Sequence, residues 1–164
     1  MEKKYILSEQ TANMKLRRMA FEIVENNRKE KKIFLAGILE NGMVIARHIK
    51  YLLEQNSSFE VRLLNIQLNK NEPLKCEIVE NDEIKDQVVI VIDDVINSGK
   101  TVLYSLIPLL LQSPRKIQTL TLVERSYKTF PLHADYVGVS LATTFQDHIQ
   151  VEVSDDKVVG AYLQ

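Results

Sequence analysis

The sequence predicts an α/β fold in which a mostly parallel central sheet is flanked by helices and carries a small accessory hairpin. The first observation is the unbroken apolar run Val88–Ile92, rich in β-branched residues. Such a run is typical of a strand buried on both faces, as in a parallel sheet. The second is that apolar strand patterns alternate with helical patterns, which favours βα units. The third is the polar turn Ser154–Asp156 between two short apolar segments, which predicts the hairpin.

A first helix is predicted after Ser8, a residue type that often precedes a helix. The apolar residues that follow recur at helical spacing and share one face. The pattern runs to about Asn27. The residues on the apolar face are Ala12, Leu16, Met19, Ala20, Ile23 and Val24.

A strand and a second helix follow as the first βα unit. The apolar segment Ile33–Ile38 predicts a compact strand, and Gly42 is expected to introduce the helix. The apolar residues of that helix fall on one side, which predicts that this side faces the core. They are Val44, Ile45, Ile49, Leu52 and Leu53.

Two further strands are predicted before the central one. Apolar and polar residues alternate in Phe59–Leu68 well enough to predict a strand. The polar segment Asn69–Pro73 is expected to turn the chain. Leu74–Val79 then predicts a short strand. This part of the chain therefore adds strands to the sheet without an intervening helix.

The central strand Val88–Ile92 is followed by two acids, Asp93 and Asp94, at its expected carboxyl end. A small polar segment then leads into an apolar helix from about Val102. Hydroxyl groups, a glycine and free amides at a helix N-terminus suit a phosphate group. The residues of this predicted phosphate loop are Asn97, Ser98, Gly99, Lys100 and Thr101.

Carboxylates beside such a loop suit the other end of a sugar phosphate. Asp93 and Asp94 can accept hydrogen bonds from ribose hydroxyls or share a hydrated magnesium ion. The sequence thus predicts a ribose 5-phosphate site. Two alternatives exist: an ordinary strand end in which Ser98 is only a helix N-cap, and a nucleoside triphosphate loop. The second is disfavoured because Asp94 replaces its leading glycine and would repel a polyphosphate.

The last elements are a strand over Lys116–Val123, entering the polar segment Glu124–Lys128, and the hairpin strands His148–Val153 and Lys157–Leu163. No repeat, linker or low-complexity segment interrupts the pattern. The expectation is therefore a single domain over residues 1–164.

Composition excludes several classes of protein. The net charge of −1 shows no excess of basic residues of the kind that binds nucleic acid in general. A single cysteine, Cys76, excludes an internal disulfide framework. The longest mostly apolar run, Val102–Leu111, is far below the ~20 residues that span a bilayer. The N-terminus lacks a signal-peptide core. A cytoplasmic location without a membrane segment is expected.

The histidines, Ser126 and the aromatic residues near it do not form a recognisable catalytic or metal-binding motif. His48 is expected on a helix surface, His133 in a loop and His148 at the start of the hairpin, and no spacing suggests a structural metal site. Ser126 lies in no recognisable nucleophile motif. Tyr127 and Phe130 either stack on a ligand or cover the end of the sheet. We therefore expect no metal bound by the protein alone.

The segment Asp93–Thr101 resembles the fingerprint of the type I phosphoribosyltransferases, which is an apolar strand, two acids, two apolar residues and a loop of the form Thr-Gly-x-Thr. The similarity extends toward the pyrimidine-operon attenuation regulators that double as uracil phosphoribosyltransferases. It covers most of the chain. The other similar segments are Tyr5–Leu7, Met19–Ile23, Leu122–Arg125 and Ala134–Gly138.

The resemblance implies that the chain binds 5-phosphoribosyl-1-pyrophosphate with Mg²⁺ and exchanges pyrophosphate for a nucleobase at C1. Asp93 and Asp94 would hold the ribose hydroxyls and act as the catalytic pair, while the predicted phosphate loop would bind the 5-phosphate. Magnesium would arrive with the substrate, near the two acids. Glu124 and Arg125 occupy the base-proximal positions. A homodimer is implied by analogy.

The chain departs from the resembled branch at three places. The pyrophosphate loop, Lys-Thr-Arg-Gly in the branch, is replaced by Leu39, Glu40, Asn41 and Gly42, so two cations are absent. The flexible loop is shortened to Leu68–Pro73, where Lys70 is the available cation. A His-Arg pair of the branch is replaced by Tyr127 and Lys128, which weakens the case for RNA as a partner.

Two functions therefore remain open. One is a phosphoribosyltransferase for a uracil-like base with a modified pyrophosphate site, and the other is a regulator or sensor that binds a ribose phosphate without efficient turnover. The segment Leu39–Gly42 distinguishes them, because a catalyst needs other donors or a metal there to replace the missing cations.

Overall fold

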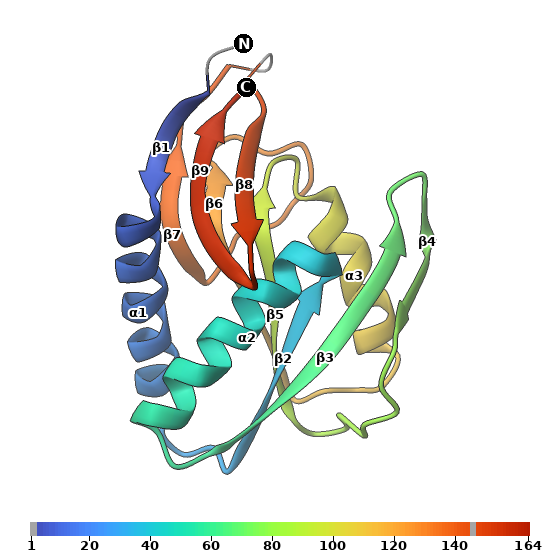
Figure 1. Ribbon diagram of the computed structural model, residues 1–164. Coiled ribbons are helices and arrows are strands. Elements are labelled where there is room, and N and C mark those ends of the chain that lie inside the picture. Colours follow the sequence, from blue (N-terminus) through green and yellow to red (C-terminus); the bar gives the residue numbers. More distant parts are fainter. Residues whose placement is uncertain (1–2, 145–146) are drawn as a thin grey trace.

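The computed structural model describes residues 3–144 and 147–164 of the chain (Figure 1). It contains a larger sheet, a smaller sheet and three helices within these residues. The elements are β1 (Lys4–Ser8), α1 (Glu9–Asn26), β2 (Lys32–Ile38), α2 (Leu39–Asn56), β3 (Glu60–Asn69), β4 (Glu72–Ile78), β5 (Val88–Ile96), α3 (Lys100–Leu110), β6 (Lys116–Arg125), β7 (Tyr136–Leu141), β8 (Ile149–Ser154) and β9 (Lys157–Leu163).

The larger sheet has the strand order β4-β3-β2-β5-β6-β7. Every neighbouring pair in it is parallel except β3 and β4, which are antiparallel. β5 pairs with β2 on one side and β6 on the other, so the predicted central strand is central. Parallel neighbours bring the carboxyl ends of β2, β5 and β6 to one edge of the sheet, where a ligand site is expected in an open α/β fold.

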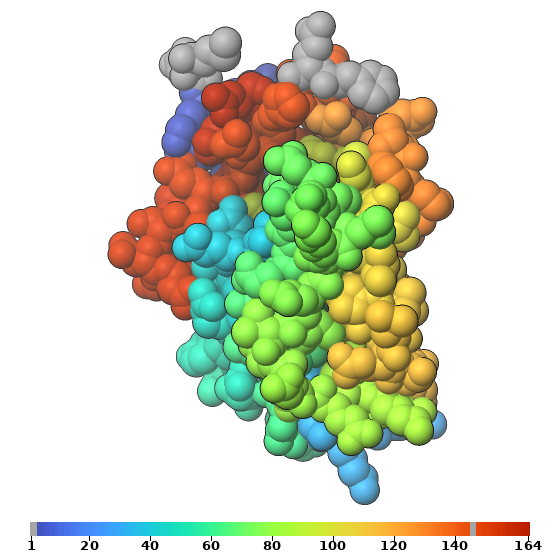
Figure 2. Space-filling model, turned by 90° about the vertical axis from the view of Figure 1, so that its right-hand side faces the viewer, coloured from blue at the N-terminus to red at the C-terminus, as the bar shows by residue number. Residues whose placement is uncertain are grey.

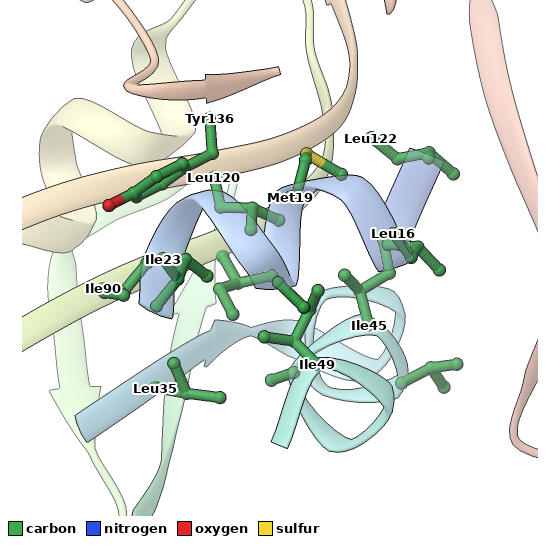
Figure 3. Close-up of a cluster of buried hydrophobic side chains, with 14 of the residues drawn as sticks. Leu16, Met19, Ile23, Leu35, Ile45, Ile49, Ile90, Leu120, Leu122 and Tyr136 are labelled. Atoms are coloured by element: carbon green, nitrogen blue, oxygen red, sulfur yellow. The ribbon is translucent and has the colours of Figure 1, made fainter. Parts of the chain in front are cut away.

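Helices cover both faces of this sheet. Along β5, Val88, Ile90 and Ile92 pack with α1 and α2, whereas Val89 and Val91 pack on the face that α3 covers. Figure 3 shows the first cluster, where Leu16 and Ile23 of α1 and Ile45 and Ile49 of α2 meet side chains of the sheet. Burial on both faces explains why the strand lacks polar alternation.

The smaller sheet has the order β1-β9-β8, with both pairs antiparallel. Its hairpin turns at Asp155 and Asp156, which both have positive φ (49° and 60°). A two-residue turn of this kind matches the twist of the flanking strands. The hairpin prediction is confirmed, but the sequence missed β1, which completes a three-stranded sheet. Figure 1 shows this sheet at the end of the molecule where β5 leads into α3.

Several predicted boundaries are wrong. The central strand continues to Ile96, so Asp93 and Asp94 lie within the strand and not after its end. The second helix begins at Leu39, before Gly42, and the third begins at Lys100. β5 is longer than its apolar run because its residues as far as Ile96 pair with β6. The helices begin before their apolar faces because helical backbone starts in a turn that the apolar pattern does not mark.

Other predictions of the sequence differ in detail. The turn between β3 and β4 contains only Lys70 and Asn71, because β4 already begins at Glu72. β7 was not predicted as a strand. The helix after Ser8 is confirmed, and the Ser8 hydroxyl accepts a hydrogen bond from the Thr11 amide as an N-cap. None of the helices in the described ranges is long and apolar enough to cross a membrane.

Candidate functional site

A cavity of about 510 Å³ lies at the carboxyl ends of β2 and β5. Four parts of the chain line it: the start of α2, the β3–β4 turn, the segment from β5 into α3, and β8 with the residue before it. In Figure 2 the β3–β4 hairpin (green) and the smaller sheet (red) reach this end of the molecule. The lining residues are Ile38, Leu39, Glu40, Asn41, Lys70, Asp93, Asp94, Val95, Ile96, Asn97, Ser98, Gly99, Thr101, Val102, His148, Ile149, Gln150 and Val151.

The acid pair Asp93–Asp94 is part of this lining. Asp93 is only 8% exposed, and its Oδ1 accepts a hydrogen bond of 3.0 Å from the Asp94 amide. Burial raises the pKa of Asp93 well above its ordinary value, and the neighbouring charge of Asp94 raises it further. The positive charge of Lys70 opposes this shift. The pair therefore differs in character: Asp93 is buried and hard to ionise, whereas Asp94 is half-buried and faces a polar partner.

That partner is Asn41, in the first turn of α2. Its Nδ2 donates to Oδ2 of Asp94 at 2.8 Å and to the backbone carbonyl of Val151 at 3.3 Å. One amide group thus joins the helix, the acid pair and the smaller sheet. A charge-assisted hydrogen bond to a carboxylate is stronger than one between neutral groups. Asn41 therefore fixes the position of Asp94 relative to β8.

The junction of β2 and α2 places Glu40 and Asn41. Leu39 has a φ of 54°, in the left-handed region that a branched side chain rarely adopts, and this costs about 1–3 kcal/mol. Gly42 packs where a Cβ would lie 2.6 Å from the Ile92 carbonyl oxygen. Only glycine allows the first turn of α2 to approach β5 so closely. The helix start is thus held against the acid-bearing strand.

The segment after β5 forms a tight turn into α3. Gly99 has a φ of 84° and precedes the first helical residue, while the Ser98 hydroxyl accepts a hydrogen bond of 3.2 Å from the Lys100 amide. The first turn of a helix leaves backbone amides without intrahelical partners. The Phe130 amide donates to the Ser98 carbonyl at 3.0 Å, which holds the turn from outside. This geometry suits an anion.

Asn97 adds an unusual feature to the same turn. Its Oδ1 is buried and has no hydrogen-bond partner within the described residues. Native structures rarely leave a buried polar atom unsatisfied, and a bound ligand or ion is one explanation for such an atom. Asn97 also lines the cavity.

The cavity brings together most, but not all, of the predicted site residues. Gly42 in α2 and Lys100 in α3 do not line it, and the Lys100 side chain is exposed. Glu124 and Arg125 also lie outside the lining. That they lie near a bound base stays a prediction.

Glu124 and Arg125 are engaged elsewhere. Glu124 forms an ion pair with Lys128 at 2.9 Å, and the two side chains are 7% and 8% exposed. The Arg125 guanidinium donates to the backbone carbonyl of Asp147, just before β8. These contacts fix the segment after β6 and the approach to the smaller sheet. Tyr127 is exposed, whereas Phe130 packs near Gly99.

The sequence missed the contribution of β8. His148, Ile149, Gln150 and Val151 line the cavity, although they are about 55 residues from the acid pair in the chain. A local pattern cannot show that a hairpin folds over the carboxyl end of a distant strand. The only available signal was the topology rule that ligands bind at that edge. His48, expected at the surface, is partly buried in α2, and burial lowers its pKa.

The phosphoribosyl transferase domain model matches residues 3–156 of the chain. The chain belongs to this family. It is 33% identical to the "Bifunctional protein PyrR" of Staphylococcus carnosus over 94% of this chain and 94% of that one. It is 30% identical to the protein of the same description from Alkaliphilus metalliredigens, over 92% and 88% of the two chains. These matches confirm the phosphoribosyltransferase family that the segment Asp93–Thr101 predicted.

Solved phosphoribosyltransferase structures share the fold. The hypoxanthine phosphoribosyltransferase of Trypanosoma cruzi superposes with a TM-score of 0.79 over 98% of this chain and 97% of that one, at 15% identity. A hypoxanthine-guanine phosphoribosyltransferase of Bacillus anthracis gives a TM-score of 0.74 at 21% identity, over 91% and 88%. The predicted fold class, a mostly parallel sheet flanked by helices with a small accessory hairpin, is confirmed, and β1 extends this hairpin to three strands.

Proposed function

We propose that this chain binds 5-phosphoribosyl-1-pyrophosphate and transfers its phosphoribosyl group to a nucleobase, with release of pyrophosphate. The observation that carries the proposal is the junction of two groups in one cavity: the acid pair Asp93–Asp94 and the turn at Gly99 that opens α3. A sugar with hydroxyls on one side and a phosphate on the other matches both. We further propose that residues 1–164 act as one domain.

The 5-phosphate occupies the turn into α3 in this proposal. Backbone amides at the helix start and the hydroxyls of Ser98 and Thr101 supply donors, and Gly99 lets the backbone approach the phosphate oxygens. Asn97 and Lys100 complete the segment, Lys100 as an exposed charge at the helix start.

The ribose hydroxyls donate to Asp94, and to Asp93 behind it. Asn41 already satisfies one oxygen of Asp94 and leaves the other for the ligand. Transfer at C1 passes through a cation of oxocarbenium character, which nearby carboxylates stabilise. The work of the protein is therefore to hold the sugar, exclude water and keep both reacting groups in line.

Magnesium fits the residues present. Asp93 and Asp94 are hard oxygen donors of the type that Mg²⁺ prefers. They would hold the ion together with the substrate, since no group of three or more possible ligands is found in the part of the chain that the structure describes. When bound, the ion supplies charge neutralisation for the departing pyrophosphate.

The nucleobase lies against the β8 side of the cavity in this proposal. His148 and Gln150 offer polar groups there, and Ile149 and Val151 offer apolar contact. Glu124 and Arg125 act from outside the cavity, Arg125 by holding the Asp147 carbonyl. A uracil-like base is proposed from the resemblance to the uracil-specific branch.

The part of the cavity that would face pyrophosphate has few groups that bind an anion. Glu40 and Asn41 stand where cations are expected, and Lys70 is the lysine among the described lining residues. This observation favours a second candidate function, a regulator or sensor that retains ribose phosphate binding without efficient turnover. RNA is a weaker partner for it, because Lys128 is buried in its ion pair with Glu124. We propose a cytoplasmic homodimer in either case.

Turnover with defined substrates tests the proposal. The purified chain is incubated with 5-phosphoribosyl-1-pyrophosphate, Mg²⁺ and a panel of nucleobases, and nucleotide and pyrophosphate are quantified. Formation of one nucleotide in equal amount with pyrophosphate supports the transferase. Tight binding of the ribose donor without nucleotide formation supports the sensor instead. Absence of both binding and turnover contradicts the proposed site.

A further inference from the structure

The cavity wall around the C1 side of the proposed ribose position is acidic. Within the described lining, Glu40 and Asp94 contribute carboxylates, with the buried Asp93 beside Asp94, against one lysine, Lys70, and one histidine, His148. Such a wall repels a group as charged as pyrophosphate unless cations accompany it. It admits a neutral nucleophile, such as water, without this repulsion.

Glu40 stands between two cavities. It lines the cavity of the acid pair, and it also lines a neighbouring one of about 530 Å³ together with Leu39, Met43, Arg47, Asn65 and Gln67. Its chain neighbour Asn41 contacts Asp94. The Glu40 carboxylate is exposed and therefore hydrated.

His148 lies farther along the same lining. Asn41 bonds to the Val151 carbonyl in β8, and His148 directly precedes this strand, where its backbone pairs with Gln164. The three residues from Val151 to His148 correspond to about 10 Å at ~3.3 Å per residue of extended chain. A ribose and a base together span such a gap. An imidazole at this place can donate a proton to the base, whereas Glu40 lies near the sugar.

We propose that the chain also hydrolyses nucleoside 5′-monophosphates to ribose 5-phosphate and a free nucleobase. This rests on the proposed function only in that the sugar phosphate occupies the same site. In the reverse of phosphoribosyl transfer, pyrophosphate bonds to C1 as the base leaves. In the hydrolysis, water takes the place of pyrophosphate.

The step is balanced without an oxidant or reductant. The N-glycosidic bond from C1 to the base breaks, and its electron pair leaves with the base, which takes a proton from the His148 ring. A bond from the water oxygen to C1 forms, and Glu40 accepts the proton that the water loses. Solvent returns that proton to His148. Asp94 holds the ribose hydroxyls and stabilises the positive charge that develops on the sugar.

The experiment uses the full chain and a panel of nucleoside 5′-monophosphates in the absence of pyrophosphate. Free base and ribose 5-phosphate are quantified by chromatography, and nucleotide binding is measured separately by calorimetry. The expected result is equimolar release of both products from at least one nucleotide, and no release from the corresponding nucleoside. General acid–base groups contribute about 10²–10⁴-fold to such a rate. Glu40→Gln should therefore lower release at least ~100-fold with nucleotide binding within about twofold of the parent.

Two matched variants serve as controls. Glu54→Gln changes an exposed carboxylate near the far end of α2, and His133→Asn changes an exposed histidine before β7. Both should release base at the parental rate, whereas His148→Asn should release it at least ~10-fold more slowly. A parent that binds nucleotides but releases no base would overturn the inference and leave the proposed function standing. Equal release by the parent and Glu40→Gln would also overturn it. A parent that binds no nucleotide would contradict both.

Discussion

The side-chain amide of Asn41 donates a hydrogen bond of 2.8 Å to Oδ2 of Asp94, 53 positions away in the chain. The same amide reaches the Val151 carbonyl. The acid that is proposed to hold the ribose is therefore positioned by the start of α2 and tied to the smaller sheet. A change at Asn41 should alter the ligand site and the packing of β8 together.

Replacing Asn41 by Ala removes this shared donor. A hydrogen bond to a charged group contributes about 1.5–3 kcal/mol, so urea unfolding should show a loss of about that size. Ribose 5-phosphate affinity should also fall, because Asp94 loses its fixed position. Asn56→Ala, at the exposed end of the same helix, is the control and should leave affinity unchanged. An unchanged affinity in Asn41→Ala would show that Asp94 does not need this partner.

Asp93 should make stability depend on pH. Its pKa is raised in the folded state by burial and by Asp94, so the unfolded chain ionises first as pH rises above 3.8. The folded state is then disfavoured through the window from 3.8 up to the raised pKa, and the loss persists above it. Asp93→Asn removes this loss and keeps an oxygen acceptor for the Asp94 amide. The variant should gain stability over the parent between about pH 4.5 and pH 7.5 in urea unfolding. A difference in stability that stays constant across this range would contradict the assignment.

Much of this site could be predicted from the sequence, and the reason is local. The strand Val88–Ile92, the acids after it and Gly99 before a helix form a continuous segment, so their spacing carries the geometry. The contributions of Asn41 and His148 could not be predicted in the same way. They reach the acid pair only through strand order and the placement of the smaller sheet, which depend on contacts between distant segments.

The fold shows the same division. Two-sided burial of β5 and the buried faces of α1 and α2 follow from the spacing of apolar residues. An unbroken apolar run places apolar side chains on both faces of a strand, and a repeat of three to four residues places them on one face of a helix. β1 was missed because it has only one buried residue, Leu7, and one half-buried residue, Ile6, and its pairing partner is β9 at the other end of the chain. The start of α2 was misplaced because Leu39 adopts a left-handed backbone that its residue type does not suggest.

The phosphate-binding turn can be tested with Thr101→Val. The variant keeps the side-chain shape but removes the hydroxyl donor, which should weaken ribose 5-phosphate binding about fivefold to tenfold for a hydrogen bond of 1–1.5 kcal/mol. Binding of ribose itself should hardly change. Thr144→Val, outside the lining, is the matched control. Equal losses for ribose and ribose 5-phosphate would indicate a general disturbance of the turn.

Breaking the buried ion pair of Glu124 and Lys128 should be costly. Removing one partner leaves an uncompensated buried charge, and such changes cost about 3–5 kcal/mol. Glu124→Gln should therefore lower the free energy of unfolding by about this amount in urea denaturation. The double change Glu124→Leu with Lys128→Met removes both charges and should cost much less. A double variant as unstable as Glu124→Gln would show that shape, and not charge, dominates this contact.

The charge of Glu40 should oppose the pyrophosphate group. Two charges about 4 Å apart repel by ~1 kcal/mol in water and more near a protein surface. Glu40→Gln should therefore bind 5-phosphoribosyl-1-pyrophosphate at least about fivefold more tightly without Mg²⁺, and the gain should shrink when Mg²⁺ is added. Affinity for ribose 5-phosphate, which lacks pyrophosphate, is the internal control. A loss of affinity in Glu40→Gln would mean that the carboxylate binds the ligand or its metal directly.

Calorimetric titration of the parent and Asp94→Asn with ribose 5-phosphate tests the central claim, that the acid pair and the turn at Gly99 form one ribose-phosphate site. The account predicts saturable one-to-one binding by the parent, at least about tenfold weaker binding by Asp94→Asn from the loss of a charge-assisted acceptor, and no comparable binding of ribose. Equal affinities of the parent and the variant for ribose 5-phosphate, or no binding by the parent, would contradict it.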